Sequence, residues 1–596
     1  MKGDEKLCLL RILMKDKGYD AYIIPHGDQH NNEYIAEGDE RIKFISNFSG
    51  SNGIGLVTKD IALMWTDGRY YIQIERELYP GWKMKKMGQG EESITDYISN
   101  NLPKKSTISM DFSLFTQGQA KQMKNKLNEY KFVDDRENLI DQCWGKLKPK
   151  YSCNKVLILP VEFTGKSVLD KYKEVDKMIQ SILDPPDMPY RMLISRLDDI
   201  AWFLNLRGND IPYNPLFFSY ALFYKTSKGF STHLFVNKEK FNSPELKEYC
   251  SKNNIVLFDY KDITNELKNN SDSVINIADE KTTNHRMYTD IENSGLETIF
   301  LREDIIENIK YVKNPTEIEG FRKANLKDSV ALIKFFAWLE EELVTKNRKD
   351  LNEYQIGLEN KKVRESQENY MGESFAPICG CGANAAIIHY EQNENLHSDM
   401  NKDLILLCDT GAQYKEGTTD ITRTLHYGTP SKKEKEMFTR VLLGNLSLER
   451  LIFKRGNTSY SLDSVPRSYL HMVGEDYLHA TSHGVGHFLN VHEGPRGHPL
   501  KPGNIITNEP GYYKKDEFGI RIENEVLVVE KGEKMLGFEN LTLLPYERNL
   551  IDLTLLSKDF RDYIDNYHKK VYEKLSPFLK NDKKALDYLK KKTAPL

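Results

Sequence analysis

The acidic residues that end or interrupt apolar, strand-like segments constrain this chain more than any other feature of its sequence. Residues 404–411 read LILLCDTG, so that an apolar run leads directly into Asp409. A carboxylate at the end of a buried strand costs several kcal/mol unless its charge is compensated. The folded chain must therefore bring a compensating group to Asp409.

A second aspartate follows in the β-rich run DITRT, residues 420–424. The two-residue period of a strand places Asp420 and the two threonines at alternate positions on one face. A turn through residues 414–417 would fold the two runs into a hairpin. We therefore expect Asp409 and Asp420 to face one site.

Two glutamates occupy comparable positions nearer the C-terminus. In NEPG, residues 508–511, the proline keeps Glu509 extended and the glycine favours a turn. Residues 519–524 read GIRIEN and lead into an apolar strand. Alternation along that segment predicts that Arg521 and Glu523 share a face.

One histidine stands out in the run HATSHGVGH, residues 479–487. His483 is followed by glycine, where the backbone could pass close to an ion. The pair His492-Glu493 has a superficial likeness to zinc-protease motifs. No second histidine follows it at the required spacing, so we reject a zincin site.

These acids and the histidine predict a metal centre when they are taken together. Four converging carboxylates would repel one another strongly, and two divalent cations would balance their charge. An oxygen-rich donor set with one imidazole suits Mn²⁺ or a similar hard ion, although affinity order alone favours Zn²⁺ or Co²⁺. The alternative is a set of separate surface acids on half-buried strands. The residues concerned are Asp409, Asp420, His483, Glu509 and Glu523.

The pattern of apolar runs predicts an α/β (α+β) protein of three domains. Strand-like and helical segments alternate over residues 1–150, and a polar, lysine-rich linker closes that part. The same kind of unit begins again over residues 151–308. A third domain, residues 309–596, opens on NPTE, residues 314–317, which carries an N-cap residue, a proline and a glutamate at the positions that begin a helix.

A weak internal repeat relates the first two predicted domains. Residues 44–50 read FISNFSG and residues 202–208 read WFLNLRG, with an aromatic residue, an asparagine and a glycine at the same spacing. Chance could produce one such match, but a duplication would explain it.

Composition excludes several functional classes. The chain has 84 basic and 88 acidic residues, a net charge of −4, which gives no footprint for nucleic acid or a membrane surface. Its apolar runs fall short of the roughly 18–20 residues that span a bilayer. The first 18 residues read as an amphipathic helix and not as a signal peptide. The seven cysteines are scattered, so we expect the reducing cytosol.

At this point the sequence resembles a known family. The strings HGVGHFLNVHEGP, NEPGYY, FGIRIENEVLVV and GTTDITRT are similar to those of the "pita-bread" metallopeptidases, and specifically of aminopeptidase P, the cytosolic Xaa-Pro aminopeptidases. The likeness extends to MWTDGRY, residues 64–70, and to the three-domain layout. Three residues depart from the pattern: His487 stands where a small residue is expected, and Ala480 and Ser482 replace glycines.

The resemblance implies a reaction and a set of metal ligands. It implies a metallo-aminopeptidase that removes the first residue of peptides with proline second, by means of a hydroxide bridging two divalent metals. Asp409 would chelate one metal, His483 and Glu509 would bind the other, and Asp420 and Glu523 would bridge both.

The resemblance also implies roles outside the ligand set. His389 and His492 would bind substrate and stabilise the oxyanion, and His492 could pass a proton to the leaving nitrogen. His479 could line the site. Arg521 would either contact substrate or orient Glu523 through an ion pair. In a homodimer, Arg69 would contact substrate, or it would simply pair with Asp67 on the surface.

Two other functions stay open on the sequence alone. A prolidase would cleave Xaa-Pro dipeptides, but prolidases have a single N-terminal domain. A metal-free pita-bread protein would serve as a binding module, but such proteins have lost the ligands that are present here.

Overall fold

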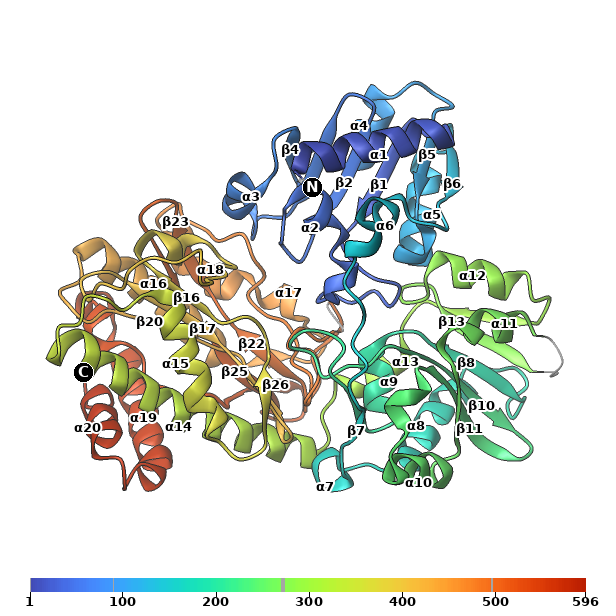
Figure 1. The fold of residues 1–596 in the computed structure, drawn as a ribbon. Coiled ribbons are helices and arrows are strands. Elements are labelled where there is room, and N and C mark those ends of the chain that lie inside the picture. The colour runs from blue at the N-terminus through green and yellow to red at the C-terminus, as the bar shows by residue number, and fades with distance from the viewer. Residues whose placement is uncertain (1, 89, 270–273, 495–496) are drawn as a thin grey trace. The chain divides into compact units, whose positions relative to one another are not determined.

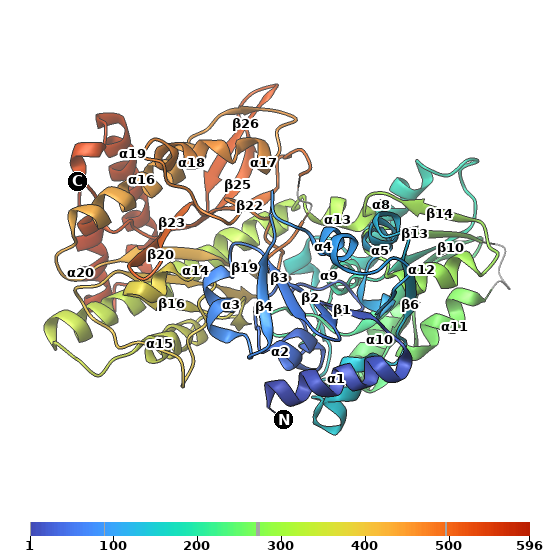
Figure 2. The same cartoon turned by 90° about the horizontal axis from the view of Figure 1, so that it is seen from above.

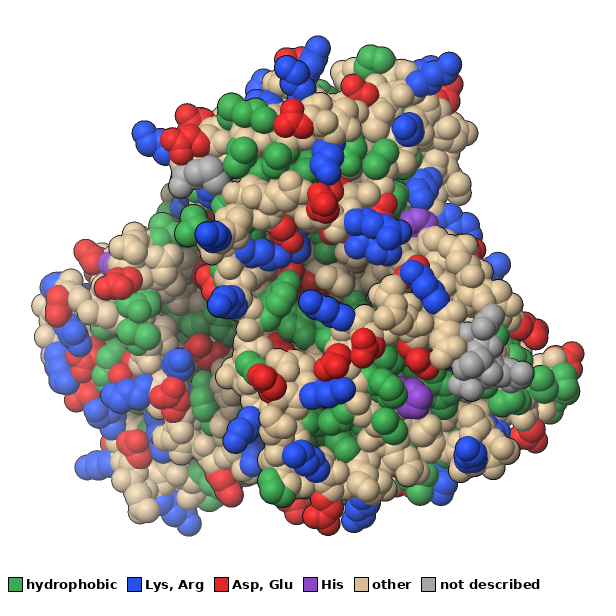
Figure 3. All heavy atoms as spheres, turned by 45° about the vertical axis from the view of Figure 1, so that its right-hand side comes forward, with side chains coloured by type: hydrophobic (Ala, Val, Ile, Leu, Met, Phe, Trp, Pro, Cys, Tyr) green, Lys and Arg blue, Asp and Glu red, His purple; other side chains and the backbone are tan. Residues whose placement is uncertain are grey.

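The computed structural model describes all residues except 1, 89, 270–273 and 495–496. The chain divides into two compact units, unit 1 comprising residues 1–161 and 166–310, and unit 2 comprising residues 162–165 and 311–596. Among the described residues, no helix is both long and apolar enough to cross a membrane. On the face drawn in Figure 3, acidic and basic side chains are interspersed, as the small net charge leads one to expect.

Unit 1 begins with a six-stranded mixed sheet in the order β4-β3-β2-β1-β5-β6 (Figure 1). Strand β2 runs antiparallel to its two neighbours, and the other pairs are parallel. Its strands are β1 (Ala21–Pro25), β2 (Ile54–Thr58), β3 (Ala62–Thr66), β4 (Trp82–Lys86), β5 (Thr107–Met110) and β6 (Lys131–Asp134). Its helices are α1 (Gly3–Lys17), α2 (Arg41–Ser46), α3 (Tyr71–Glu77), α4 (Ile94–Asn101), α5 (Gln117–Lys126) and α6 (Leu139–Trp144).

Helices cover both faces of this sheet. Helix α1 lies against one face of the sheet (Figure 2). It buries Leu7, Leu10 and Met14, whose spacing places them on one side of a helix, against a core that includes Tyr22 of β1. Gly18 ends α1 at a φ of 72°, a conformation that glycine adopts without strain. Helices α4 and α5 supply the core of the opposite face. The predicted N-terminal amphipathic helix is therefore confirmed.

A second sheet in unit 1 repeats this topology, in the order β12-β11-β10-β8-β13-β14. Its strands are β8 (Tyr190–Ile194), β10 (Ser219–Thr226), β11 (Gly229–Val236), β12 (Ile255–Asp259), β13 (Ile275–Asp279) and β14 (Thr298–Leu301). Its helices are α8 (Val168–Gln180), α9 (Leu197–Phe203), α10 (Pro244–Lys252), α11 (Ile263–Lys268), α12 (His285–Glu292) and α13 (Ile305–Lys310). The short strands β7 (Leu157–Ile158) and β9 (Leu206–Arg207) pair with each other, and α7 spans Val161–Thr164.

The sequence repeat falls at equivalent points of the two sheets. Asn47 follows α2 and Asn205 follows Leu204 at the end of α9, with φ angles of 71° and 50°. Asparagine tolerates this left-handed conformation better than most residues, which explains why it recurs at this position. The shared strand order confirms two related α/β domains, while the domain boundary at residue 150 stays a prediction.

Unit 2 opens on helix α14 (Pro315–Glu340), at the predicted start. The Asn314 side chain accepts hydrogen bonds from the backbone N–H groups of Thr316 and Glu317 and so caps the helix. The helices that follow are α15 (Glu353–Glu365), α16 (Lys432–Glu449), α17 (Ser459–Leu462), α18 (Ser464–His471), α19 (Lys558–Leu575) and α20 (Lys583–Lys592). A π-helical turn, Glu341–Thr345, extends α14.

The described residues of unit 2 also form four small sheets, in the orders β15-β18-β19, β16-β17-β20, β21-β26-β25-β22 and β23-β24. The strands are β15 (Tyr370–Glu373), β16 (Ile378–Cys381), β17 (Leu406–Thr410), β18 (Ala412–Tyr414), β19 (Gly417–Thr418), β20 (Ile421–Leu425), β21 (Phe453–Lys454), β22 (Ile505–Asn508), β23 (Gly511–Lys514), β24 (Phe518–Arg521), β25 (Asn524–Glu530) and β26 (Met535–Asn540). Helix α16 packs on several of these strands, and α14 packs on α15, α19 and α20. The mixed architecture confirms the predicted fold class.

Candidate metal centre

The predicted hairpin brings Asp409 beside strand β20. Strands β17 and β20 pair antiparallel, with Asp409 opposite Thr422, and β18 and β19 form a second pair within the connection. Asp420 directly precedes β20 and is buried. The predicted turn through residues 414–417 and the pairing of the two runs are therefore confirmed.

Three donors form the core of the site. Ligand atoms of Asp420, His483 and Glu523, all buried, lie within 4.8 Å of one another. His483 Nε2 is 3.4 Å from Asp420 Oδ2, and the Thr422 hydroxyl donates to Glu523 Oε2 at 2.8 Å. These residues are far apart in the chain and come together only in the folded protein.

Glu509 completes this side of the cluster. Its Oε1 atom lies 3.5 Å from His483 Nε2. The other ring nitrogen of His483, Nδ1, lies 2.9 Å from the Gly484 carbonyl oxygen, which can only accept a hydrogen bond. A neutral ring then carries its proton on Nδ1 and directs the Nε2 lone pair at the carboxylates, as a metal ligand requires.

Asp409 stands at the edge of the cluster and is held by Arg521. Arg521 Nη2 and Nε donate to Asp409 Oδ2 at 2.6 and 3.1 Å. Asp409 Oδ1 is buried without a hydrogen-bond partner among the described residues. An acceptor with no donor in a buried position fits a metal ligand.

The cluster has an excess of buried acidic groups, which added positive charge would stabilise. Burial, followed by the charge of Asp409, raises the pKa of Asp420 to about 7. Burial also raises the pKa of Glu509 to about 7, against the attraction of His483. Burial and the neighbouring acids raise the pKa of Glu523 well above its usual value. The acids cannot all be ionised at neutral pH without a cation, so the donor set fits divalent metal ions.

The other histidines singled out in the sequence border this cluster. The ring of His492, which is partly exposed, lies 4.4 Å from the ring of His483, centroid to centroid. His479 is buried, and its Nδ1 atom is 3.6 Å from Glu509 Oε2. His389 is partly exposed and follows Ile388, whose carbonyl oxygen accepts from Arg521 at 3.3 Å.

Arg521 and Glu523 do reach the same group, although not through one continuous strand. Arg521 ends β24 and Glu523 precedes β25, which pairs with a different strand. Both contact the Thr422 hydroxyl, Arg521 Nε at 3.3 Å. The ion pair of Arg521 is with Asp409 and not with Glu523.

Sequence reasoning missed one residue of this network. The hydroxyl of Tyr513 lies 2.8 Å from His479 Nε2 and accepts a hydrogen bond from Arg521 Nη1 at 2.8 Å. It thus joins the two sides of the cluster. The available signal was its place in NEPGYY, four residues after Glu509, but nothing in that string shows the pairing of β23 with β24.

The departure at His487 has a structural explanation. His487 is buried, with its ring 5.8 Å from that of Phe321 in α14. A Cβ atom at Gly320 would lie 3.2 Å from His487 Nε2 and 2.2 Å from the Glu416 carbonyl oxygen. Gly320 therefore leaves the room that this larger side chain occupies.

Arg69 lies in unit 1 and pairs with Asp67. Its Nε and Nη2 atoms donate to the two carboxylate oxygens of Asp67, each at 2.8 Å, and Nη1 reaches Glu33 at 3.4 Å. About a fifth of its side chain is exposed (20%). A contact with substrate stays a prediction.

Comparison with known proteins covers the whole chain. The model of metallopeptidase family M24 matches residues 319–530, that of its C-terminal region matches residues 534–596, and models of the creatinase/prolidase N-terminal domain match residues 7–143 and 147–317.

Two relatives are similar over their full length. A probable Xaa-Pro aminopeptidase P from Pyrenophora teres f. teres is 38% identical over 99% of this chain and 92% of its own. Xaa-Pro aminopeptidase 1 from Dictyostelium discoideum is 39% identical over 99% of this chain and 96% of its own. The crystal structure of X-prolyl aminopeptidase from Caenorhabditis elegans, described as a cytosolic enzyme with a di-nuclear active site, is 32% identical, covers 100% of both chains and superposes with a TM-score of 0.94.

Proposed function

The chain belongs to metallopeptidase family M24 as a full-length relative of the Xaa-Pro aminopeptidases, and from this premise we propose how its residues carry out the reaction. It is a metal-dependent hydrolase that removes the first residue of peptides with proline in the second position. The main observation that supports this function is the buried cluster of carboxylates around His483. The similarity to these enzymes extends over the whole chain.

We propose a specific set of ligands for two divalent metal ions. Asp409 would chelate one ion, His483 and Glu509 would bind the other, and Asp420 and Glu523 would bridge them. The orphan Oδ1 atom of Asp409 and the orientation of the His483 ring support this assignment. Mn²⁺ is the ion we propose, because oxygen-rich sites with a single imidazole favour hard cations.

When bound, the two ions supply Lewis acidity that polarises the scissile carbonyl and acidifies the attacking water. The residues around them position the reactants. Arg521 fixes Asp409 through two N–H groups, and Tyr513 fixes Arg521 in turn. His479 and Arg521 would border the bound peptide on this side.

His492 and His389 are the proposed partners of the reacting bond. His492 lies beside His483 and is partly exposed, so its ring is accessible from outside the cluster. A protonated His492 would donate to the proline nitrogen as the peptide bond breaks and would take its next proton from solvent. His389 would donate a hydrogen bond to the developing oxyanion.

The assembly and the compartment are also proposals. We propose a homodimer in which Arg69 contacts the peptide, since its guanidinium is partly exposed and carries several donors. We propose the cytosol as its compartment, in keeping with a structural relative described as cytosolic.

A direct test compares two substrate classes on the full-length protein after Mn²⁺ is added. Hydrolysis of Xaa-Pro-Xaa tripeptides with little turnover of Xaa-Pro dipeptides supports the aminopeptidase. Preference for the dipeptides would identify a prolidase, and no turnover of either class would identify a binding module.

A further inference from the structure

Unit 1 contains a cavity of about 550 Å³ whose lining includes none of the proposed metal ligands or of the histidines assigned to the peptidase reaction. Strand ends from both six-stranded sheets surround it. His30 follows the carboxyl end of β1, Ser113 follows that of β5, and Asn237 and Tyr260 follow those of β11 and β12. Ligands of open α/β sheets bind beyond the carboxyl ends of the strands. The position and the volume are therefore those of a small-molecule site.

Five aromatic rings form a continuous wall of this cavity. Tyr151 packs on Phe218 with ring centroids 4.9 Å apart, and Phe218 lies 5.8 Å from His30. His30 then packs on Tyr220 at 4.3 Å, and Tyr220 on Tyr260 at 5.2 Å. Such a wall presents ring faces that attract an apolar body or a cation.

His30 is fixed in this wall by hydrogen bonds at both ring nitrogens. Nδ1 lies 2.8 Å from the Ser195 carbonyl oxygen, and Nε2 lies 2.7 Å from the Tyr260 hydroxyl. Burial lowers the pKa of His30 to about 4, so the ring is neutral at physiological pH. The wall is therefore rigid and carries no charge of its own.

Two of the cations that line the cavity, the buried Lys240 and the partly exposed Arg286, are already paired. Lys240 forms a buried ion pair with Asp210. Arg286 donates to Asp111 at 2.9 Å and to Asp134 at 2.6 Å. An anionic ligand would find these charges neutralised.

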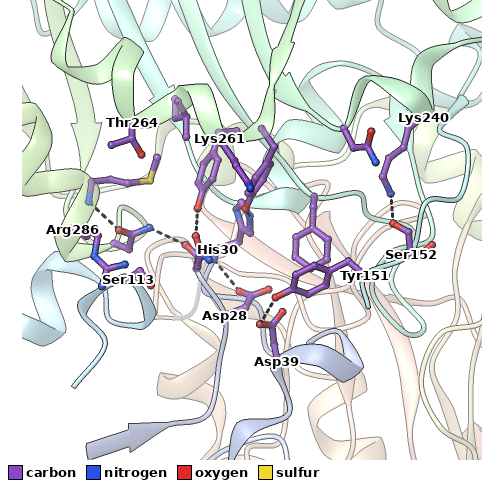
Figure 4. A pocket seen from close by; sticks show the side chains of 18 of the residues that line it. Asp28, His30, Asp39, Ser113, Tyr151, Ser152, Lys240, Lys261, Thr264 and Arg286 are labelled. Carbon is purple, nitrogen blue, oxygen red and sulfur yellow. Dashed lines mark hydrogen bonds between the residues drawn. The ribbon is translucent and has the colours of Figure 1, made fainter. Parts of the chain in front are cut away.

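Asp28 and Asp39 are the acids of the lining that Figure 4 labels. Their negative charges are compensated only in part. Asp28 is 3% exposed, and its partners among the described residues are uncharged: the backbone N–H of His30 at 2.9 Å and both the backbone and the side chain of Asn32. Asp39 binds Arg41, whose guanidinium also binds Asp141, and Lys148 binds Asp141 at 2.6 Å. Two cations thus face the three acids Asp28, Asp39 and Asp141, which leaves room for one more positive charge.

We propose that this cavity binds a small organic amine with an aromatic or apolar body, its ammonium group beside Asp28 and Asp39 and its body against the aromatic wall. The site would be separate from the metal centre, which lies entirely in unit 2. An amine gains both from the carboxylates and from the ring faces, whereas an acid of the same shape keeps the contact of its body with the rings but is repelled by the carboxylates.

Two exposed cysteines, one at the cavity and one away from it, allow ligand binding at the cavity to be tested. Cys153 lines the cavity and is exposed, and Cys8 on α1 is exposed elsewhere and serves as an internal control. Full-length protein is alkylated with iodoacetamide in the presence of tryptamine, 3-methylindole or indole-3-acetate, and the rate at each thiol is followed by peptide mass spectrometry. These probes share one ring system and carry a positive, no and a negative charge.

Saturating tryptamine should slow alkylation of Cys153 about tenfold, because such a pocket buries most of its ligand's surface and the bound ring would block access of the reagent to a thiol in the lining. Alkylation of Cys8 should be unchanged, and indole-3-acetate should give no protection. Equal protection by all probes, or no protection of Cys153 by tryptamine at millimolar concentration, would overturn the proposal.

Two variants separate the amine site from an anion site. Asp28→Asn should weaken tryptamine protection about tenfold through loss of the charge pairing. Lys261→Gln removes an exposed cation at the same cavity and should leave protection unchanged. Protection by indole-3-acetate that is lost in Lys261→Gln would assign the site to anions and overturn the proposal. If Asp28→Asn fails to fold, Tyr260→Leu, which shortens the wall, should weaken protection instead, and full protection in that variant would contradict the proposal.

Discussion

Arg521 binds Asp409 through one carboxylate oxygen only. Both contacts, from Nη2 at 2.6 Å and Nε at 3.1 Å, are to Oδ2, and Oδ1 is left buried without a hydrogen-bond partner among the described residues. The arginine thus orients the carboxylate without occupying the oxygen that we assign to the metal. It also keeps positive charge beside a cluster in which acids predominate.

Arg521→Lys should weaken binding of the metal at Asp409 by about 10–100-fold, the usual cost of losing a group that orients a ligand. Lysine keeps the charge but cannot donate from two fixed N–H groups. Calorimetric titration of Mn²⁺ into the metal-free variant measures the effect. Arg364→Lys is the matched control, because Arg364 forms a buried pair with Asp328 in the same unit. It should lower stability and leave metal affinity alone; equal losses in the two variants would refute the orienting role.

His492→Ala should lower kcat by roughly 10²–10⁴-fold if the ring transfers a proton in the transition state. Both metals should remain bound, since His492 is not assigned as a ligand. Steady-state kinetics with metal analysis of the purified variant checks both points. Loss of a metal ion would make His492 a ligand.

If Arg69 contacts substrate in the proposed homodimer, Arg69→Ala should raise KM for peptides while metal content and the mass in solution stay unchanged. The substitution removes several donors but no metal ligand. Kinetics on short and longer peptides, with light scattering for the mass, provides the test. Unaltered KM on both would leave Arg69 as a surface residue paired with Asp67, as its two 2.8 Å contacts allow.

Metal removal should make stability fall as pH rises. In the metal-free fold the pKa values of Asp420 and Glu509 are raised to about 7, from about 4 in an unfolded chain. The folded state then binds more protons than the unfolded state between these values, so stability is fully present below about pH 4 and is lost as pH rises through 7. Thermal unfolding at several pH values, with and without Mn²⁺, measures the difference. Identical pH slopes in the two preparations would contradict the compensation argument.

The sequence predicts those parts of the structure whose geometry depends on a single strand or a single helix cap. Asp409 is predicted from the apolar run that it ends, Asp420 from the alternation in the next run, and Asn314 from a capping pattern that needs no tertiary contact. In each case the interaction that decides the geometry joins residues close together in the chain. The local sequence pattern is therefore enough to predict it.

The rest depends on pairing between distant segments. The segment from Arg521 to Glu523 reads as one strand, yet the chain changes sheets there because β24 pairs with β23 and β25 with β22. The same pairing gives Tyr513 its place beside Arg521. The cavity of unit 1 has no sequence signature, because its wall comes from strand ends of two sheets.

The most direct test of the metal centre is Glu523→Gln, measured for metal content and turnover together. The change preserves shape but removes the charge of a proposed bridging ligand. We predict a folded protein that retains at most one metal ion per chain and has lost turnover of Xaa-Pro-Xaa peptides. A variant that keeps two metal ions and the wild-type rate would contradict the proposed centre.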